Sequence, residues 1–209
     1  FPKYDERASR MREALSIIRR LLNGEKLDYE GEYYNTKGAK LYSPPLKEVP
    51  IWLAAGGPKS SHLAAEFADG LMISVKNPED AYERVINPAQ IKTDELGKSQ
   101  LRVHTYRWTM FAQNDDDAWE SLKSWRGLRA PNRLQEIDPQ ALREQADSLP
   151  KEEIMSKFSR AGTIDELVDI YSPLVDDFGS EIVTIQISSV DQEETIKLLG
   201  KELLPRLKK

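Results

Sequence analysis

A chain of 209 residues, 39% of them hydrophobic, is long enough to bury one sizeable core. The net charge of -5 argues against a nucleic-acid partner, because a phosphate-binding surface needs a basic excess. The chain has no cysteine, which excludes disulfides and thiolate metal sites, and no apolar run approaches the roughly 20 residues that cross a bilayer. We therefore expect a cytoplasmic protein with neither a membrane nor a nucleic-acid partner.

The first predicted element is an amphipathic helix over residues 7–22, which Asn23-Gly24 ends. The sequence runs into it from Phe1 without an initiator methionine or a signal peptide, so we expect it to begin inside a longer chain. Residues 29–45 contain several turn residues and are expected to form a loop with short extended pieces. The apolar stripe predicted for the helix consists of Ala8, Met11, Ala14, Leu15, Ile18, Leu21 and Leu22.

Short apolar strands then alternate with helices along the rest of the chain. Continuous apolar strands in such an alternation predict a parallel sheet covered by helices. Four strand–helix units make half of an eight-stranded barrel, so the predicted fold class is α/β, a parallel (β/α) barrel of about half the usual size. A half barrel leaves two sheet edges open, so either a partner closes it or the chain is part of something longer. The predicted strands cover residues 50–55, 71–74, 102–112 and 182–187, and the helices 60–68, 77 onward, 115–125 and 191–207.

Residues 1–209 are expected to form a single domain with a helical insertion over about 113–160. The acidic run over residues 115–117 is expected to cap the helix that follows it. Thr163 and Glu166 form a capping box for a further helix, which Pro173 should end or kink. The inner stripe predicted for the last helix consists of Ile196, Leu199, Leu203 and Leu207.

The sharpest local feature is a glycine turn between the first strand and its helix, at Gly56-Gly57-Pro58. Glycines at the end of a strand let the backbone approach a ligand closely, and the helix that follows presents free N–H groups and a positive dipole end. Lys59 and Ser60 would add donors in the first turn, which makes the segment a candidate phosphate site. The alternative is a tight turn without a ligand.

Three cations lie on the same predicted face or in the insertion: Lys76, Arg133 and Lys157. If they converge, they would bind a phosphate monoester, and the arginine would add bidentate geometry. Taken singly, each is equally a solvated surface charge. His62 and His104 are interpreted as packing or surface residues, and because no pair has metal-ligand spacing we predict no metal.

Several landmarks, in this order and spacing, resemble the luciferase-like superfamily and, within it, the F420-dependent glucose-6-phosphate dehydrogenase group. The resemblance covers essentially the whole chain. It implies a (β/α) barrel, usually a homodimer, that binds coenzyme F420 at the carboxyl ends of its strands; FMN is the alternative cofactor. The landmarks are Gly31–Ala39, Val49–Pro58, Ala68–Gly70, Asp138-Pro139, Leu149-Pro150 and Leu203–Leu207.

The resemblance also implies roles for individual residues. Family positions that hold the phosphate side of the coenzyme match the glycine turn, and family positions that bind a sugar phosphate match basic residues here. Lys157 stands where the family usually has arginine and Arg133 where it has lysine, which weakens the match to glucose-6-phosphate itself. The coenzyme residues so implied are Gly56, Gly57, Lys59 and Ser60, and the substrate residues are Lys76, Arg133, Lys157 and, more loosely, Ser74.

In the family, the base, the acid and the aromatic residue beside the deazaflavin ring come from the first four strands. None of those positions exists in this chain, so no residue is assigned as catalytic. The first hypothesis is a portion of an enzyme that transfers hydride between a sugar phosphate and F420, completed by a second copy or a complementary barrel half. The alternatives are an F420-dependent alcohol dehydrogenase, a methylene-tetrahydromethanopterin reductase relative, or a catalytically silent barrel fragment that acts by assembly.

Overall fold

The computed structural model describes residues 2–207, which form two compact units. The first comprises Phe1–Ile73 and Glu79–Val103, and the second Ser74–Pro78 and His104–Lys209. Parallel strands with covering helices occur in both, so the predicted α/β class with a parallel sheet is confirmed. None of the helices within residues 2–207 combines the length and the apolar character that crossing a membrane requires.

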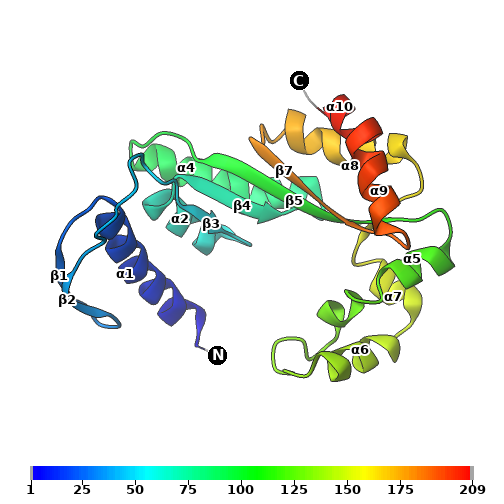
Figure 1. Ribbon diagram of the computed structural model, residues 1–209, viewed down its shortest axis with the longest axis horizontal. Coiled ribbons are helices and arrows are strands. Elements are labelled where there is room, and N and C mark those ends of the chain that lie inside the picture. The colour runs from blue at the N-terminus through cyan, green and yellow to red at the C-terminus, as the bar shows by residue number, and fades with distance from the viewer. Residues whose placement is uncertain (1, 208–209) are drawn as a thin grey trace. The chain divides into compact units, whose positions relative to one another are not determined.

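The first unit opens with the helix α1, Tyr4–Leu22, beside an antiparallel hairpin of β1, Leu27–Glu30, and β2, Asn35–Ala39 (Figure 1). The carboxylate of Glu13 fastens the hairpin turn to α1, since it accepts N–H groups of residues 32–34 at 2.9 to 3.1 Å. The helix is confirmed, and its predicted stripe is partly wrong. Ala8 and Leu15 are buried, while Met11 and Ile18 are more than 40% exposed and Ile17 is buried instead.

The parallel pair of the first unit is β3, Trp52–Ala54, and β4, Gly70–Ser74. Between them runs α2, Pro58–Phe67, which packs against α4, Asn87–Glu95. A π-helical turn, Tyr82–Ile86, joins α4 to the short α3, Pro78–Ala81. Gly70 is required here, because a Cβ at this position would lie 2.3 to 2.6 Å from ring atoms of Trp52.

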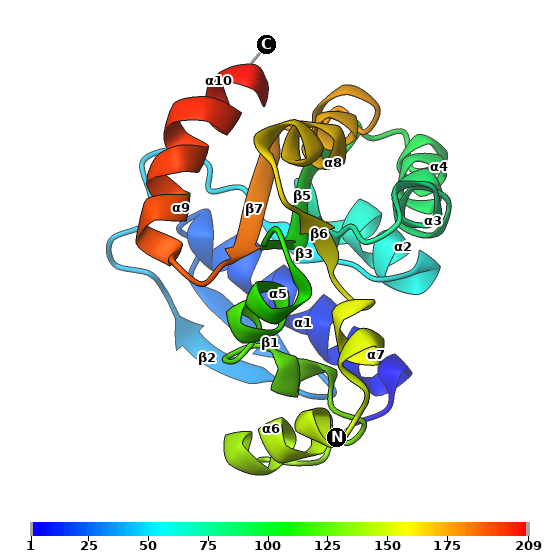
Figure 2. The same cartoon turned by 90° about the vertical axis from the view of Figure 1, so that its right-hand side faces the viewer.

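In the second unit, β5, Arg102–Phe111, is paired in parallel with both β6, Ser159–Ala161, and β7, Ile182–Ser188, and the three lie side by side in Figure 2. The sequence missed β6, since three residues are too few to display a strand pattern. β5 itself begins in the first unit, where the N–H of Arg102 donates to the carbonyl of Asp69.

The two faces of β5 have different partners. Thr109 and Arg107 face α8, Ile164–Asp176, where the hydroxyl of Tyr171 lies 2.9 Å from the Thr109 hydroxyl and donates to the Arg107 carbonyl at the same distance. The Arg107 guanidinium donates to the carbonyl of Ile170. Because side chains alternate along a strand, the opposite face carries His104, Tyr106, Trp108 and Met110.

Burial raises the pKa of Tyr171 to about 12, which makes stability depend on alkaline pH. An unfolded chain ionises this tyrosine near its ordinary value, so between about pH 10 and 12 the unfolded state loses the proton first. We expect the free energy of unfolding to fall by about 2 to 3 kcal/mol over this range. Denaturant titrations at several pH values would measure it; the Tyr171→Phe variant should lack this part of the slope, and equal slopes for both proteins would contradict the prediction.

The predicted insertion contains α5, Asp115–Ser121, a 3-10 turn, Arg126–Arg129, α6, Pro139–Asp147, and α7, Lys151–Met155. They share a core with the end of β5. The predicted acidic cap is corrected: Asn114 caps α5 by accepting the N–H of Asp117, and the three aspartates occupy the first turn, where the helix dipole favours negative charge. The members of this core are Met110, Ala112, Ala118, Leu122, Ala130, Ala146, Ile154 and Phe158.

Thr163 caps α8 as predicted, while the carboxylate of Glu166 accepts the N–H of Gly162. Of the two outcomes predicted for Pro173, an end or a kink, the end is wrong, because α8 continues to Asp176. Proline removes one helical hydrogen bond, and the buried residues on both sides of it, Tyr171 and Leu174, hold the helix in place.

The last helix is confirmed over α9, Gln192–Leu198, and α10, Leu204–Leu207, with a π-helical turn, Leu199–Leu203, between them. The predicted stripe is partly wrong: Leu199 and Leu203 are buried, but Ile196 is 64% exposed.

Candidate functional site

The glycine turn connects the end of β3 to α2 in the first unit. A Cβ placed on Gly56 or Gly57 would meet nothing within 4 Å, and Gly57 has an extended backbone, φ 178° and ψ 176°, that any residue can adopt. Neither packing nor backbone conformation within this unit therefore requires glycine at the turn. The space beside the two glycines can instead receive a group from outside the unit.

Hydrogen-bond donors face this turn. No side chain caps α2, and its first residue, Pro58, has no N–H, so the N–H groups of Lys59 and Ser60 have no carbonyl within the helix. The Ser60 hydroxyl is committed to the turn itself, since it accepts the N–H of Gly56 at 3.2 Å and donates to the carbonyl of Gly57 at 2.9 Å. Ser60 thus shapes the turn, and its backbone N–H remains for a ligand.

Lys59 carries an exposed positive charge beside this turn. Its ammonium lies 3.4 Å from a carboxylate oxygen of Asp5 and 5.5 Å from the ring centre of Tyr4, both at the start of α1. The side chains of Lys59 and Asp5 are 74% and 88% exposed, and an ion pair so exposed contributes little stability. Lys59 can therefore exchange Asp5 for an incoming anion at small cost.

Ser74 and Lys76 are exposed at the end of β4, in the part of the chain that belongs to the second unit. The N–H of Val75 donates to the carbonyl of Tyr106 at 2.9 Å. In a parallel ladder this bond places Val75 opposite Arg107. Because side chains alternate along a strand, Ser74 and Lys76 then lie on the same face of the sheet as Trp108.

The two remaining predicted cations differ in their surroundings. Lys157 forms an ion pair of 3.1 Å with Glu153, and the two side chains are 34% and 49% exposed. Arg133 is exposed and lies close enough to Arg129 for its charge to lower the pKa of that guanidinium, after the larger effect of burial. Phe158, which follows Lys157 in the sequence, packs edge-on against Trp108 with 5.5 Å between the ring centres.

Sequence reasoning missed Arg129. Its guanidinium lies 4.9 Å from the ring centre of Phe158 and 5.9 Å from that of Trp108. Nothing in the irregular segment around it signals these aromatic neighbours, which come from β5 and from the turn before β6. The sequence shows only an arginine near Arg133 in a segment rich in charge.

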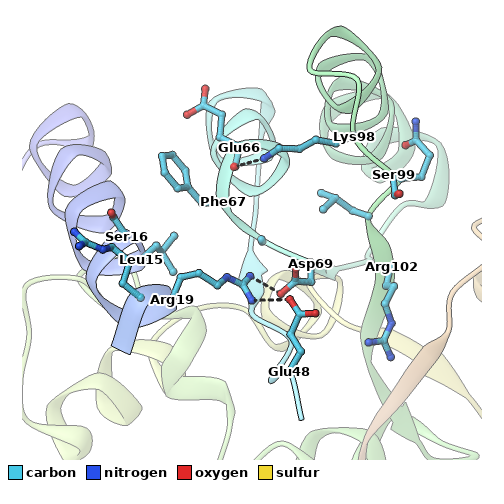
Figure 3. Close-up of a pocket in the computed structure, with 14 residues that line it drawn as sticks. Leu15, Ser16, Arg19, Glu48, Glu66, Phe67, Asp69, Lys98, Ser99 and Arg102 are labelled. Carbon is cyan, nitrogen blue, oxygen red and sulfur yellow. Dashed lines mark hydrogen bonds and ion pairs between the residues drawn. The ribbon is translucent and has the colours of Figure 1, made fainter. Parts of the chain in front are cut away.

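A cavity of about 720 Å³ lies in the first unit, lined by α1, the end of α2 and the start of β5 (Figure 3). Two of its cations are engaged within the fold: Arg19 donates to Asp69 at 2.5 Å and to Glu48 at 3.5 Å, and Lys98 donates to main-chain carbonyls at the end of α2. Asp69 also accepts the N–H of Ile51 at 2.7 Å. Asp69 and Lys98 lie just before β4 and β5, whereas the glycine turn follows the end of β3. The cluster is therefore at the strand ends opposite to the glycine turn, and it stabilises the fold.

Neither histidine belongs to the glycine turn or lines the cavity. His104 lies 2.8 Å from the hydroxyl of Thr184 on the neighbouring β7, and His62 is exposed on α2. Among residues 2–207, no three His, Asp or Glu side chains are arranged to hold a metal ion.

The family model of the luciferase-like monooxygenases matches residues 3–176. The chain belongs to this family. Among curated relatives, the F420-dependent glucose-6-phosphate dehydrogenases of Mycolicibacterium gilvum (strain PYR-GCK) and Microbacterium testaceum (strain StLB037) are 31% and 32% identical over 214 residues. The match covers 100% of this chain and 63% of each relative, so the chain spans less than two thirds of their length. The resemblance stated from the sequence is confirmed.

Solved structures agree on the fold. An F420-dependent secondary alcohol dehydrogenase in complex with an F420–acetone adduct superposes with a TM-score of 0.86 at 24% identity, over 100% of this chain and 64% of that one. The coenzyme F420-dependent tetrahydromethanopterin reductase from Methanopyrus kandleri gives 0.71 at 23% identity, over 96% and 64%. At such identities the likeness shows the fold alone, and a partial barrel of the luciferase-like type accounts for it.

Proposed function

We propose that this chain is the coenzyme- and phosphate-binding portion of an F420-dependent oxidoreductase that transfers hydride between a phosphorylated alcohol, such as glucose-6-phosphate, and coenzyme F420. The observation that carries the proposal is the glycine turn, where open space beside Gly56 and Gly57 meets an uncapped helix of ten residues. The curated relatives, which are F420-dependent glucose-6-phosphate dehydrogenases, support the choice of coenzyme.

The residues of the turn suit a phosphate-bearing coenzyme. The N–H groups of Lys59 and Ser60 and the positive end of α2 would hold an anionic group, and the Lys59 ammonium would neutralise it. The hydroxyl of Ser60 would act through the turn, by holding Gly56 and Gly57 in place. When bound, F420 supplies a deazaflavin ring that accepts a hydride from the alcohol carbon.

In the second unit, Ser74, Lys76, Arg133 and Lys157 are proposed to bind the substrate. Basic residues at three of these positions favour a phosphorylated substrate, because Lys and Arg form charge-assisted hydrogen bonds with phosphate oxygens that a neutral alcohol does not offer. The group that takes the hydroxyl proton would come from the part of the relatives that this chain does not cover, or from a second copy in a homodimer. The four residues would therefore bind and orient the substrate, which itself lowers the barrier.

A second candidate is an F420-dependent alcohol dehydrogenase or reductase without a phosphorylated substrate. The ion pair between Lys157 and Glu153 favours it, because a phosphate would have to compete with Glu153 for one of the three predicted ligands. A silent fragment that acts only by assembly is the third reading, and coenzyme binding distinguishes it from both enzymes.

The test is a titration of F420 with the purified chain, in which quenching of the coenzyme's own fluorescence reports binding. The titration is repeated in the presence of FMN. We expect saturable binding of F420 that excess FMN does not displace. Displacement by FMN would assign the turn to a flavin instead. A folded chain of the correct mass that leaves F420 fluorescence unchanged would overturn the proposed coenzyme site.

A further inference from the structure

Arg129 occupies an unusual position for a charged residue. It ends the 3-10 turn and is half-buried, with its guanidinium against the rings of Phe158 and Trp108. Its Nε is buried and has no hydrogen-bond partner among the described residues. Since Nε is enclosed, an incoming ligand would reach the terminal Nη1 and Nη2, which are not enclosed and also have no hydrogen-bond partner among residues 2–207.

The surrounding charge points to an anion as that partner. Arg133 is the charged neighbour whose effect on Arg129 is repulsive, and no carboxylate within residues 2–207 forms an ion pair with either arginine. The nearby carboxylate of Asp147 is already engaged by two nitrogens of Arg126. Both guanidinium groups lack a carboxylate partner in the described part of the chain, and a dianionic group that both of them contact would relieve the repulsion.

Arg129 lies close in the fold to residues that are predicted to bind the substrate. Trp108 is on the face of β5 that Ser74 and Lys76 share, and Phe158 follows Lys157 directly. Lys157 is already paired with Glu153, whereas Arg129 has no carboxylate partner among residues 2–207, so Arg129 can add to the phosphate-binding cations.

We propose that Arg129 is a specificity-determining residue that binds the phosphate group of the substrate together with Arg133, and so selects phosphorylated over neutral alcohols. This inference rests on the proposed function and deepens it. The planar guanidinium can donate two parallel hydrogen bonds to phosphate oxygens, and the rings of Phe158 and Trp108 fix its plane.

The experiment compares binding of glucose-6-phosphate, inorganic phosphate and glucose to the full chain by calorimetry. Arg129→Met keeps the apolar stem against Phe158 and removes the charge, Arg129→Lys keeps a charge without the fork, and Arg143→Met is a matched control on exposed α6. We expect Arg129→Met to weaken glucose-6-phosphate binding at least tenfold and Arg129→Lys by less. Binding of glucose should be unchanged in every variant, and Arg143→Met should behave as the parent chain.

F420 binding, measured on the same samples, separates this inference from the proposed coenzyme site. Loss of phosphate binding in Arg129→Met with unchanged F420 affinity supports it, and phosphate binding that depends on Arg129 supports it even in a chain that does not bind F420. A folded Arg129→Met variant that binds glucose-6-phosphate within twofold of the parent overturns it, as does a parent chain that binds neither phosphate. If Arg129→Met does not fold, the exposed Arg133→Met decides, and binding within twofold of the parent overturns the proposal.

Discussion

The Gly57→Asp variant should bind F420 at least about 100-fold more weakly than the parent chain while retaining its stability. The new carboxylate would occupy the open space beside the turn and face the N–H groups at the start of α2, where it repels an incoming phosphate. A 100-fold loss corresponds to about 2.7 kcal/mol, a reasonable cost for one unfavourable charge near a bound anion. The measurement is the fluorescence titration of F420, with thermal unfolding of the same sample.

Two controls give this result its meaning. Gly200→Asp makes the same chemical change at a glycine that also has nothing within 4 Å of a Cβ but lies far along the chain, in the π-helical turn of the last helix. It should leave F420 affinity unchanged. Gly57→Ala adds only a methyl group and should weaken binding by less than the aspartate does. Equal affinity for Gly57→Asp and the parent chain would show that the coenzyme does not use this turn.

The Asp147→Ala variant should lower the free energy of unfolding by about 2 to 4 kcal/mol, the largest stability loss we expect from one surface-accessible side chain. Arg126, only 9% exposed, donates through Nε and Nη2 to Asp147, and its guanidinium lies 4.4 Å from the ring centre of Trp119. Without Asp147 the guanidinium would remain buried with its charge unpaired. The range lies below that of a fully buried pair because the Asp147 side chain is 39% exposed.

Chemical denaturation measures this loss, and the double variant Arg126→Met/Asp147→Ala tests its cause. Removing both partners leaves no buried charge, so the double variant should recover much of the stability. A single variant within about 0.5 kcal/mol of the parent would contradict the prediction. Because Arg126 and Arg129 share one 3-10 turn, Asp147→Ala should also weaken phosphate binding if Arg129 binds phosphate.

The sequence determined the elements whose signals are local. Apolar runs such as 71–74, set between turn residues, predict buried parallel strands because such strands need no polar face. Thr163 marks the start of α8 because its hydroxyl satisfies a helix N–H three residues on, an interaction that depends on spacing alone. The glycine turn was visible for the same reason, since two adjacent glycines between a strand and a helix are a feature of the chain itself.

Tertiary structure decided whatever depends on partners distant in sequence. Pro173 lies inside α8 because burial of its neighbours offsets one missing hydrogen bond, and Ile196 is exposed although it has helical spacing to the buried Leu199. The environment of Arg129 is set by rings from β5 and from the turn before β6, so its sequence neighbours give no hint of it. Helix starts and strands follow from local hydrogen bonding and periodicity, whereas burial, charge and the partners of a side chain follow from which segments the fold brings together.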